Sequence, residues 1–404
     1  MDLDLTDLLN SARKQFDKLT DTQGAHLTPV AELTINGQAF GTQTMSRIIS
    51  VEMTDKRGFE ADELTIELDD RDGAIAIPQT GDKITLKLGY AETGVVDLGE
   101  YLFTEFSHSG SPDTLHITAI AADLAETFAE QKEKSWHKQT LYQIVETIAK
   151  QNGYTGDKCK IATQYQAEKI DHIDQTGESD SSFLSRLAEQ YGAIATVKHG
   201  VFLFTPEGNA QTVSGAAIPE LVITRQAGDR HNFTYSATNS YNAVRAYYTD
   251  KKTGKRKEVI VSKDNLQADK KTISKTHVYK RPRKDKKTGK IIRSQTTTKT
   301  VSQHRRIDSS GLKIKTLRHL YASEATAWNG AAAAFKKLQR GAAEFSITLA
   351  TGRPDLSPET PVSVSGFKVE IDAEKWLIVE VQHHLDDGGY TSSLKLEARL
   401  DLDS

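Results

Sequence analysis

Short runs of alternating apolar and polar residues fill the first third of the chain and limit its fold more than any other feature. In the run 63–68, Leu64, Ile66 and Leu68 alternate with polar residues and so share one face of a strand. Similar runs occupy residues 29–36, 48–53, 83–90, 101–108 and 115–121. Turn signals such as Asn36-Gly37 separate them, and no helical pattern interrupts the series. This part of the chain therefore predicts an antiparallel β-barrel or sandwich.

A mixed α and β pattern follows between residues 125 and 215. Apolar residues at helical spacing predict a helix that ends at Asn152-Gly153; they are Leu141, Ile144, Val145, Ile148 and Ala149. A polar run before a second predicted helix offers four N-cap residues: Thr176, Ser179, Asp180 and Ser181. Gly192 ends that helix, and residues 193–198 and 201–204 flank the turn pair His199-Gly200 as a hairpin. The segment predicts a small α+β module.

The last part of the chain is again rich in β patterns. Strands are predicted at 221–224, 243–248, 344–349, 361–364, 376–381 and 390–400, with an alanine-rich helix at 322–340. A length of 404 residues suits about two to four domains. We expect an N-terminal arm at 1–25, a first β domain at 26–124, a connecting α+β module at 125–215 and a second β domain at 216–404.

Charge is unevenly distributed, although the formal net charge is only −3. Residues 251–306 hold 20 Lys plus Arg against 4 Asp plus Glu, a local balance of +16 that leaves −19 for the remainder. The hexapeptide DKKTGK occurs at 250–255 and again at 285–290, and each copy places Gly where a tight turn needs it. We interpret 251–306 as an insertion of two basic hairpins, of which the second protrudes.

The second hairpin carries the candidate partner-binding residues Lys280, Arg281, Arg283, Lys284, Lys286, Lys287 and Lys290. Tyr279 is the only Phe, Trp or Tyr in 251–306, a composition that suits phosphate contact rather than base stacking. An acidic protein surface is the first interpretation of its partner. A solvated projection and DNA are the alternatives.

Two histidine groups are candidate sites. His383 and His384, with Asp386 and Asp387, suggest a metal site, but adjacent strand residues point to opposite faces, so a polar cluster near a turn is favoured. His172, flanked by Asp171 and Asp174, suggests an acid–base pair, and a structural hydrogen bond is favoured instead.

Other reactive groups have structural explanations as well. Glu178 and Asp180 resemble the paired carboxylates of a glycosidase, but helix capping explains both. Cys159, the only cysteine, is interpreted as an inert thiol, which excludes a disulfide framework. No phosphate-binding loop, dinucleotide-binding turn, nucleophile elbow, signal peptide or membrane span is visible. We therefore expect no catalytic, metal or cofactor-binding residues, and synthesis in a cytoplasm.

One motif carries a family resemblance. It consists of Asp174, Gln175, Glu178, Ser179, Asp180, Phe183, Leu184, Arg186 and Leu187. This pattern resembles the late control protein D family of tailed phages, the central baseplate hub proteins of contractile tails, which are similar in fold to the base of type VI secretion spikes. Weaker matches extend the resemblance over most of residues 29–400, including Gly81-Asp82 in the first β domain and Gly352-Arg353-Pro354-Asp355-Leu356 in the second. The insertion 251–306 departs from the family pattern.

The resemblance implies a mainly β fold with two antiparallel β-barrels related by a pseudo-repeat and joined by the α+β module. It implies a non-enzymatic homotrimeric ring in a phage tail baseplate, made in the host cytoplasm and joining the hexameric tail tube to the trimeric central spike. Implied partners are the tube protein, the spike protein and the tape-measure protein, with DNA only passing through the ring and no membrane insertion. A tail-tip cell-wall hydrolase and a DNA-binding accessory protein that uses the basic insertion are the alternatives.

Overall fold

The computed structural model describes residues 27–122, 128–236, 241–266, 269–284, 291–303, 307 and 309–399, and between 267 and 303 it describes the backbone alone. The arm predicted at 1–25 lies outside this part of the chain. The described residues are mainly β-structure and divide into two compact units: residues 1–239 with 336–404, and residues 240–335. No helix within the described ranges is long and apolar enough to cross a membrane.

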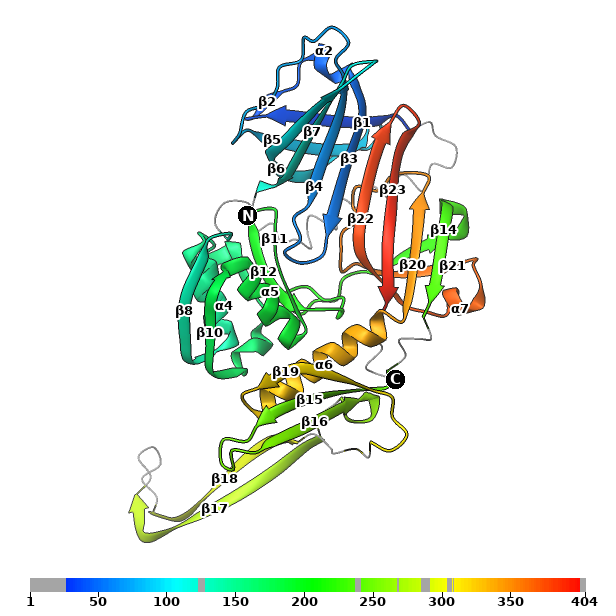
Figure 1. Ribbon diagram of the computed structural model, residues 1–404. Helices are drawn as coiled ribbons and strands as arrows, with labels where there is room; N and C mark the ends of the chain where they lie inside the picture. Colours follow the sequence, from blue (N-terminus) through cyan, green and yellow to red (C-terminus); the bar gives the residue numbers. More distant parts are fainter. Residues whose placement is uncertain are drawn as a thin grey trace. The chain divides into compact units, whose positions relative to one another are not determined.

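The alternating runs of the N-terminal region form seven antiparallel strands in the order β3-β4-β7-β6-β5-β1-β2 (Figure 1). Their bounds are β1 Pro29–Ile35, β2 Gln38–Ala39, β3 Ile48–Lys56, β4 Glu63–Asp69, β5 Lys83–Tyr90, β6 Gly94–Ser109 and β7 Thr114–Ala121. Leu64, Ile66 and Leu68 of β4 are fully buried, as their alternation predicts. One turn of helix, α2 (Thr42–Met45), interrupts the series, and its pattern was too short to predict.

The C-terminal strands extend the same sheet. They are β13 Leu221–Thr224, β14 Gly228–Tyr235, β20 Ala343–Leu349, β21 Pro361–Ser365, β22 Trp376–Asp386 and β23 Gly389–Ala398, with the short helix α7 at Val369–Asp372. β22 pairs with β3 in antiparallel register, so that Leu385 lies opposite Val51, and a single sheet of 13 strands results (Figure 1). Among the described strands no pairing closes this sheet into a barrel, so the two-barrel arrangement stays a prediction.

The α+β module follows its prediction closely. Its main elements are β8 Gln131–Thr140, α4 Leu141–Gln151, β9 Cys159–Ile161, β10 Lys169–Ser179, α5 Asp180–Tyr191, β11 Ala193–Lys198 and β12 Val201–Pro206. Both predicted helices and the β11–β12 hairpin are confirmed. Of the four N-cap candidates, Ser179 caps α5, while Gly192 ends it in the left-handed conformation at φ 60°. β8, which pairs with β10, was not predicted, because its sequence is charged and only one residue, Trp136, is buried.

The second unit holds β15 Ala243–Thr249, β16 Arg256–Ser262, β17 Asp269–Lys284, β18 Ile291–Gln303, β19 Ile314–Tyr321 and most of α6, Glu324–Arg340. The backbone forms both predicted hairpins: β15 pairs with β16, and β17 pairs with β18 over a long ribbon (Figure 1). β17 and β18 make a sheet of two strands with no other described strand beside them. The predicted alanine-rich helix is confirmed as α6.

Candidate functional site

The family motif lies at the junction of β10 and α5, where it encloses a buried carboxylate. A bulge between Gln175 and Glu178 turns the strand toward the helix, and the side chain of Asp180 is only 1% exposed. Its Oδ2 accepts hydrogen bonds from Lys132 Nζ at 2.6 Å and Asn152 Nδ2 at 2.8 Å, and its Oδ1 accepts from Gln175 Nε2 at 2.9 Å. Burial opposes ionisation, but these donors outweigh it and lower the pKa of Asp180.

The other motif residues fix the outer side of this junction. Arg186 forms a two-point ion pair with Glu178, at 3.1 and 2.8 Å, and donates to the carbonyl of Asp174 at 2.9 Å. Phe183 stacks on Trp136 of β8 with ring centroids 6.3 Å apart, and Leu184 and Leu187 complete a core in which all three motif side chains are fully buried. The motif is therefore a structural lock between a strand and a helix.

This geometry does not suit the hydrolase alternative. Asp180 is enclosed by three donors, and both oxygens of Glu178 face the Arg186 guanidinium. A glycosidase needs two carboxyl groups about 5–10 Å apart that both face a sugar-binding cleft. At Cys159, burial raises the pKa of the thiol to about 11, which disfavours the thiolate form.

Asp174 is the exception among the motif residues, since its side chain lies on the outer face of the β8–β10 pair. Its Oδ1 accepts from Ser135 Oγ at 2.6 Å, and its Oδ2 lies 3.0 Å from His172 Nε2. The hydrogen bond from Ser135, aided by the neighbouring imidazoles, lowers the pKa of Asp174. The hydrogen-bonding role predicted for His172 is consistent with this contact. His137, which faces His172 across the two strands, was missed because β8 was not predicted.

The two histidines at the end of β22 lie on opposite faces, as expected. His383 is 1% exposed, and its Nδ1 lies 2.9 Å from both Ser392 Oγ and Tyr390 Oη. Burial lowers its pKa to about 4, and nearby Asp355 only partly offsets this. The side chain of His384 is 39% exposed and lies 3.2 Å from Asp386. No group of three or more His, Cys, Asp or Glu side chains within the described ranges is arranged to hold a metal ion.

A five-residue ionic cluster, unforeseen from the sequence, joins the α+β module to the sheet. Arg57 follows β3 and contacts Glu207 at 3.3 Å, Glu359 at 2.8 Å and Glu397 at 2.6 Å. Arg340, at the end of α6, contacts Glu207 at 2.5 Å and Glu397 at 3.0 Å and is only 3% exposed. Burial raises the pKa of Glu359, because its charged form is poorly solvated there. The cluster brings together residues from five separate places in the chain.

A second ionic group reinforces the same junction. Lys198 of the β11–β12 hairpin contacts Asp55 at 2.5 Å and Asp62 at 2.6 Å. Two carboxylates share one ammonium group in a buried place, and burial raises the pKa of Asp55 to about 7. The two ionic groups together hold the α+β module against the sheet by specific ion pairs as well as by apolar contacts.

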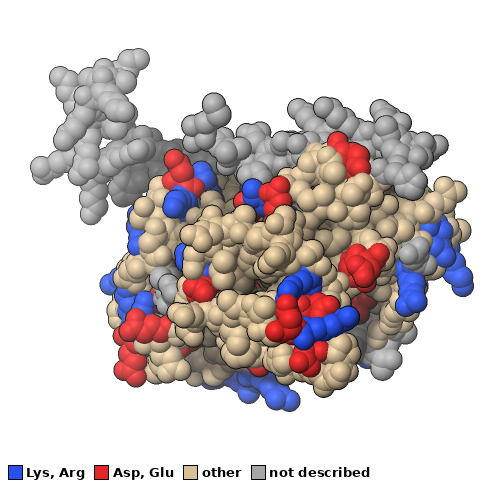
Figure 2. Space-filling view, turned by 90° about the horizontal axis from the view of Figure 1, so that it is seen from above, with Lys and Arg blue, Asp and Glu red and all other residues tan. Residues whose placement is uncertain are grey.

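The candidate partner-binding residues lie on β17 and beyond it. Lys280, Arg281, Arg283 and Lys284 belong to β17, whereas Lys286, Lys287 and Lys290 lie outside the described residues. On the face shown in Figure 2, several Lys and Arg side chains lie close to Asp and Glu side chains. The basic insertion is thus the strongest local excess of one charge in the sequence.

The arrangement of strands is shared with known tail proteins. A 43 kDa tail protein of prophage MuSo2 from Shewanella oneidensis matches with a TM-score of 0.58 and 16% identity, over 91% of this chain and 98% of that one. A component of the Escherichia coli type VI secretion system, whose structure is described as similar to bacteriophage T4 tail proteins, matches with a TM-score of 0.51 and 14% identity over 92% of this chain and 77% of that one. The chain therefore shares its fold with these tail proteins.

Sequence comparison narrows this class to one family. The model of the phage tail baseplate hub family (GPD) matches residues 63–389. Proteins named probable baseplate hub protein from Escherichia phages 186 and P2 are 40% and 38% identical to this chain over 385 residues, which cover 95% of this chain and 96% and 97% of theirs. The chain belongs to the phage tail baseplate hub family, as its motif predicts.

Proposed function

We propose that three copies of this chain close into a ring that joins the hexameric tail tube to the trimeric central spike of a phage baseplate. Family membership over nearly the whole chain is the observation that carries the proposal. The sheet supports it, because β14 and β2 end the order of strands and each has one described partner. Such edges need a partner or protection, and contact between neighbouring subunits supplies one.

The two-barrel pseudo-repeat belongs to the same proposal. The hairpins β3–β4 and β22–β23 lie on either side of the β22–β3 pairing, and that pairing is antiparallel. Two antiparallel hairpins that meet side by side are related by a local two-fold axis, which is the arrangement that a duplicated domain would give. Two similar β domains in each of three subunits would offer six near-equivalent surfaces to the tube.

We propose that the basic hairpin docks on an acidic surface of another tail protein, such as the tube, spike or tape-measure protein. Neutralising Lys280, Arg281, Arg283 and Lys284 should weaken that docking, whereas neutralising Lys251, Lys252, Lys255 and Arg256 at the other hairpin is the matched control. Steep salt-dependent binding to duplex DNA, lost in the first variant alone, would favour the DNA-binding alternative.

The proposed role needs no catalysis by this chain. The carboxylates of Glu178 and Asp180, the residues on which the hydrolase alternative depends, are engaged in structural contacts. An assay on peptidoglycan should therefore show no activity from the purified chain. Activity that disappears in Glu178→Gln while the fold is kept would overturn this part of the proposal.

The ring is tested by measuring the mass of the full-length chain in solution by light scattering, together with particle images. We expect a three-subunit species with an open centre, alone or after addition of the spike protein encoded by the same phage. A chain that remains monomeric in the presence of that spike protein would contradict the proposal. The protein is expected to be made in the host cytoplasm and then incorporated into the virion tail.

A further inference from the structure

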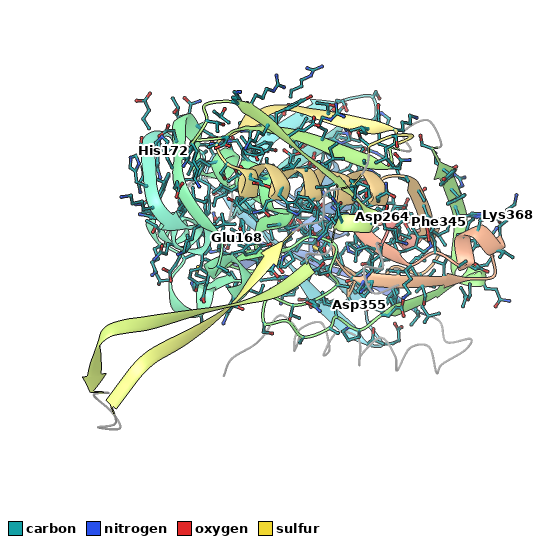
Figure 3. All side chains as sticks on the ribbon, turned by 90° about the horizontal axis from the view of Figure 1, so that it is seen from below. Glu168, His172, Asp264, Phe345, Asp355 and Lys368 are labelled. Carbon is teal, nitrogen blue, oxygen red and sulfur yellow. The ribbon has the colours of Figure 1, made fainter. Side chains whose placement is uncertain are left out.

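The outer face of the β8–β10 pair carries two imidazoles that the structural lock does not use. His137 and His172 are direct cross-strand partners, and their Nδ1 atoms lie 3.0 Å apart. Their rings are nearly parallel, with an interplanar angle of 19° and centroids 4.6 Å apart. The side chain of His172 is 52% exposed (Figure 3), and His137 is exposed as well, so both imidazoles are accessible to solvent. Two ring nitrogens that face each other in this way share either a proton or a metal ion.

We propose that His137 and His172 bind a divalent transition-metal ion, Zn²⁺ or Cu²⁺, through their two Nδ1 atoms, with water completing the coordination. Imidazole nitrogen is a preferred ligand of both ions. With a metal–nitrogen bond of about 2.0 Å, two nitrogens lie about 3.3 Å apart in tetrahedral geometry and about 2.8 Å apart in adjacent square-planar positions. The observed 3.0 Å falls between these values, so small rotations of the rings accommodate either ion.

The surroundings of His172 match those of a histidine ligand. Metal-bound histidines usually donate their other ring N–H to a carboxylate, which fixes the tautomer and the ring orientation. Here the Oδ2 of Asp174 lies 3.0 Å from Nε2 of His172, while Ser135 holds the second oxygen of that carboxylate at 2.6 Å. A hydrogen on Nε2 leaves the Nδ1 lone pair of His172 free to bind a metal. Asp174 is therefore a positioning residue, and this gives a role to the one motif side chain that the lock leaves outside.

The absence of a third ligand among the described residues fits this geometry. Asp174 contacts the far side of the His172 ring, so it orients a ligand rather than serving as one. A site with two imidazoles and water leaves coordination positions open. Its affinity should therefore be moderate, and the open positions allow a further ligand to bind.

The test is titration of the untagged full-length chain with Zn²⁺ by calorimetry, and with Cu²⁺ by electron paramagnetic resonance to count bound nitrogens. We expect one site of micromolar affinity whose Cu²⁺ spectrum shows two equivalent nitrogens. His137→Ala and His172→Ala should each weaken binding at least tenfold, and Asp174→Asn should weaken it severalfold. Circular dichroism of each variant checks that the fold is kept.

His384→Ala is the matched control, because His384 is also exposed beside carboxylates, those of Asp386 and Glu52, and within the described ranges it is not paired with a second imidazole. It should bind both ions as the wild-type chain does. The proposal is overturned if His384→Ala loses as much affinity as His172→Ala. It is also overturned if the double variant His137→Ala/His172→Ala binds as tightly as wild type, since the pair would then be hydrogen-bonded only.

Discussion

Asp180 shows most directly how a single residue of the family motif acts. It is a buried anion with three donors, whereas an Asn at this position keeps one acceptor oxygen and turns an NH2 group toward the donors Lys132, Asn152 and Gln175. We expect Asp180→Asn to lower the free energy of unfolding by about 2–4 kcal/mol, measured by urea denaturation. Asp157→Asn is the control, since that side chain is 91% exposed and should change the stability by less than about 0.5 kcal/mol. Equal effects of the two substitutions would contradict a structural role for the motif.

His383 should make stability depend on pH. Its pKa in the folded chain is lowered to about 4 from an ordinary value near 6.5, so the unfolded chain binds more protons in this window and stability falls as pH falls through it. Between pH 7 and pH 5, the contribution of His383 to the free energy of unfolding should fall by about 2 kcal/mol. Asp55, whose pKa is raised to about 7, stabilises the folded chain at low pH and loses this effect as pH rises through 7.

The two contributions have opposite signs, so they are separated by comparing variants. Urea denaturation at pH 7 and pH 5 should show that acidification from pH 7 to pH 5 favours the folded state more in His383→Gln than in the wild-type chain. In Asp55→Asn the same acidification should favour the folded state less than in the wild-type chain. The exposed His384→Gln serves as the control, and its profile should follow wild type. Identical profiles for all four proteins would contradict the assignment.

Prediction from sequence at the residue scale succeeded where contacts are local. The presence of an N-cap among four candidates that include Ser179, the cap at Gly192 and the opposite orientation of His383 and His384 all follow from neighbouring residues. It failed where contacts are distant. Arg57 and Glu397 are far apart in the sequence, and nothing in the local pattern indicates that they meet in a buried ionic cluster.

At the scale of elements, the packing of α6 depends on Arg340, the last residue of the helix. Arg340 is enclosed by Glu207 and Glu397, so its loss leaves excess negative charge buried. Arg340→Met should lower the free energy of unfolding by about 3–5 kcal/mol. Lys337→Met on the same helix is the control, because the side chains of Lys337 and its partner Glu189 are 66% and 72% exposed. Thermal denaturation of the two variants should separate them clearly, and a similar small effect of both would argue against a structural joint.

The β17–β18 ribbon should be dispensable for the fold. Its strands pair only with each other within the described structure, so replacing residues 267–303 by a short Gly-Ser linker removes no other sheet contact. We expect circular dichroism to show an otherwise intact β-rich protein whose unfolding midpoint lies within a few degrees of wild type. Loss of cooperative unfolding would show that the ribbon supports the rest of the chain.

Elements were predictable when their own sequence carried both pattern and boundary. The α4 and α5 helices have apolar faces and clear stop signals, and the hairpin β11–β12 has a two-residue turn. β8 lacks these signals, because charged residues occur on both of its faces, with Lys132 and Lys134 on one and Glu133 on the other. It becomes a strand only through its pairing with β10, which local sequence does not reveal.

For the whole molecule, the order of β-rich, α+β and β-rich segments was predictable, but the joining of the two β regions into one sheet was not. The single sheet forms only when β22 pairs with β3, and tertiary packing determines both this partner and the register of the pairing. We expect a chain that ends after Tyr235 to lack a stable sheet, because β3 then loses its partner on one side. Such a chain should aggregate or be digested rapidly in limited proteolysis, whereas the full chain resists. A soluble, protease-resistant fragment would contradict this.

The pairing of β22 with β3 also has a consequence for synthesis on the ribosome. Glu52 and its cross-strand contact Gln382 are separated by 330 residues. At about 5–20 residues per second, the ribosome needs roughly 15–65 seconds to produce the second strand after the first. During this interval the edge of β3 that will pair with β22 has no partner strand in the nascent chain. β3 carries polar side chains, among them Glu52, Thr54 and Lys56, and these reduce the tendency of its unpaired edge to aggregate before β22 is synthesised.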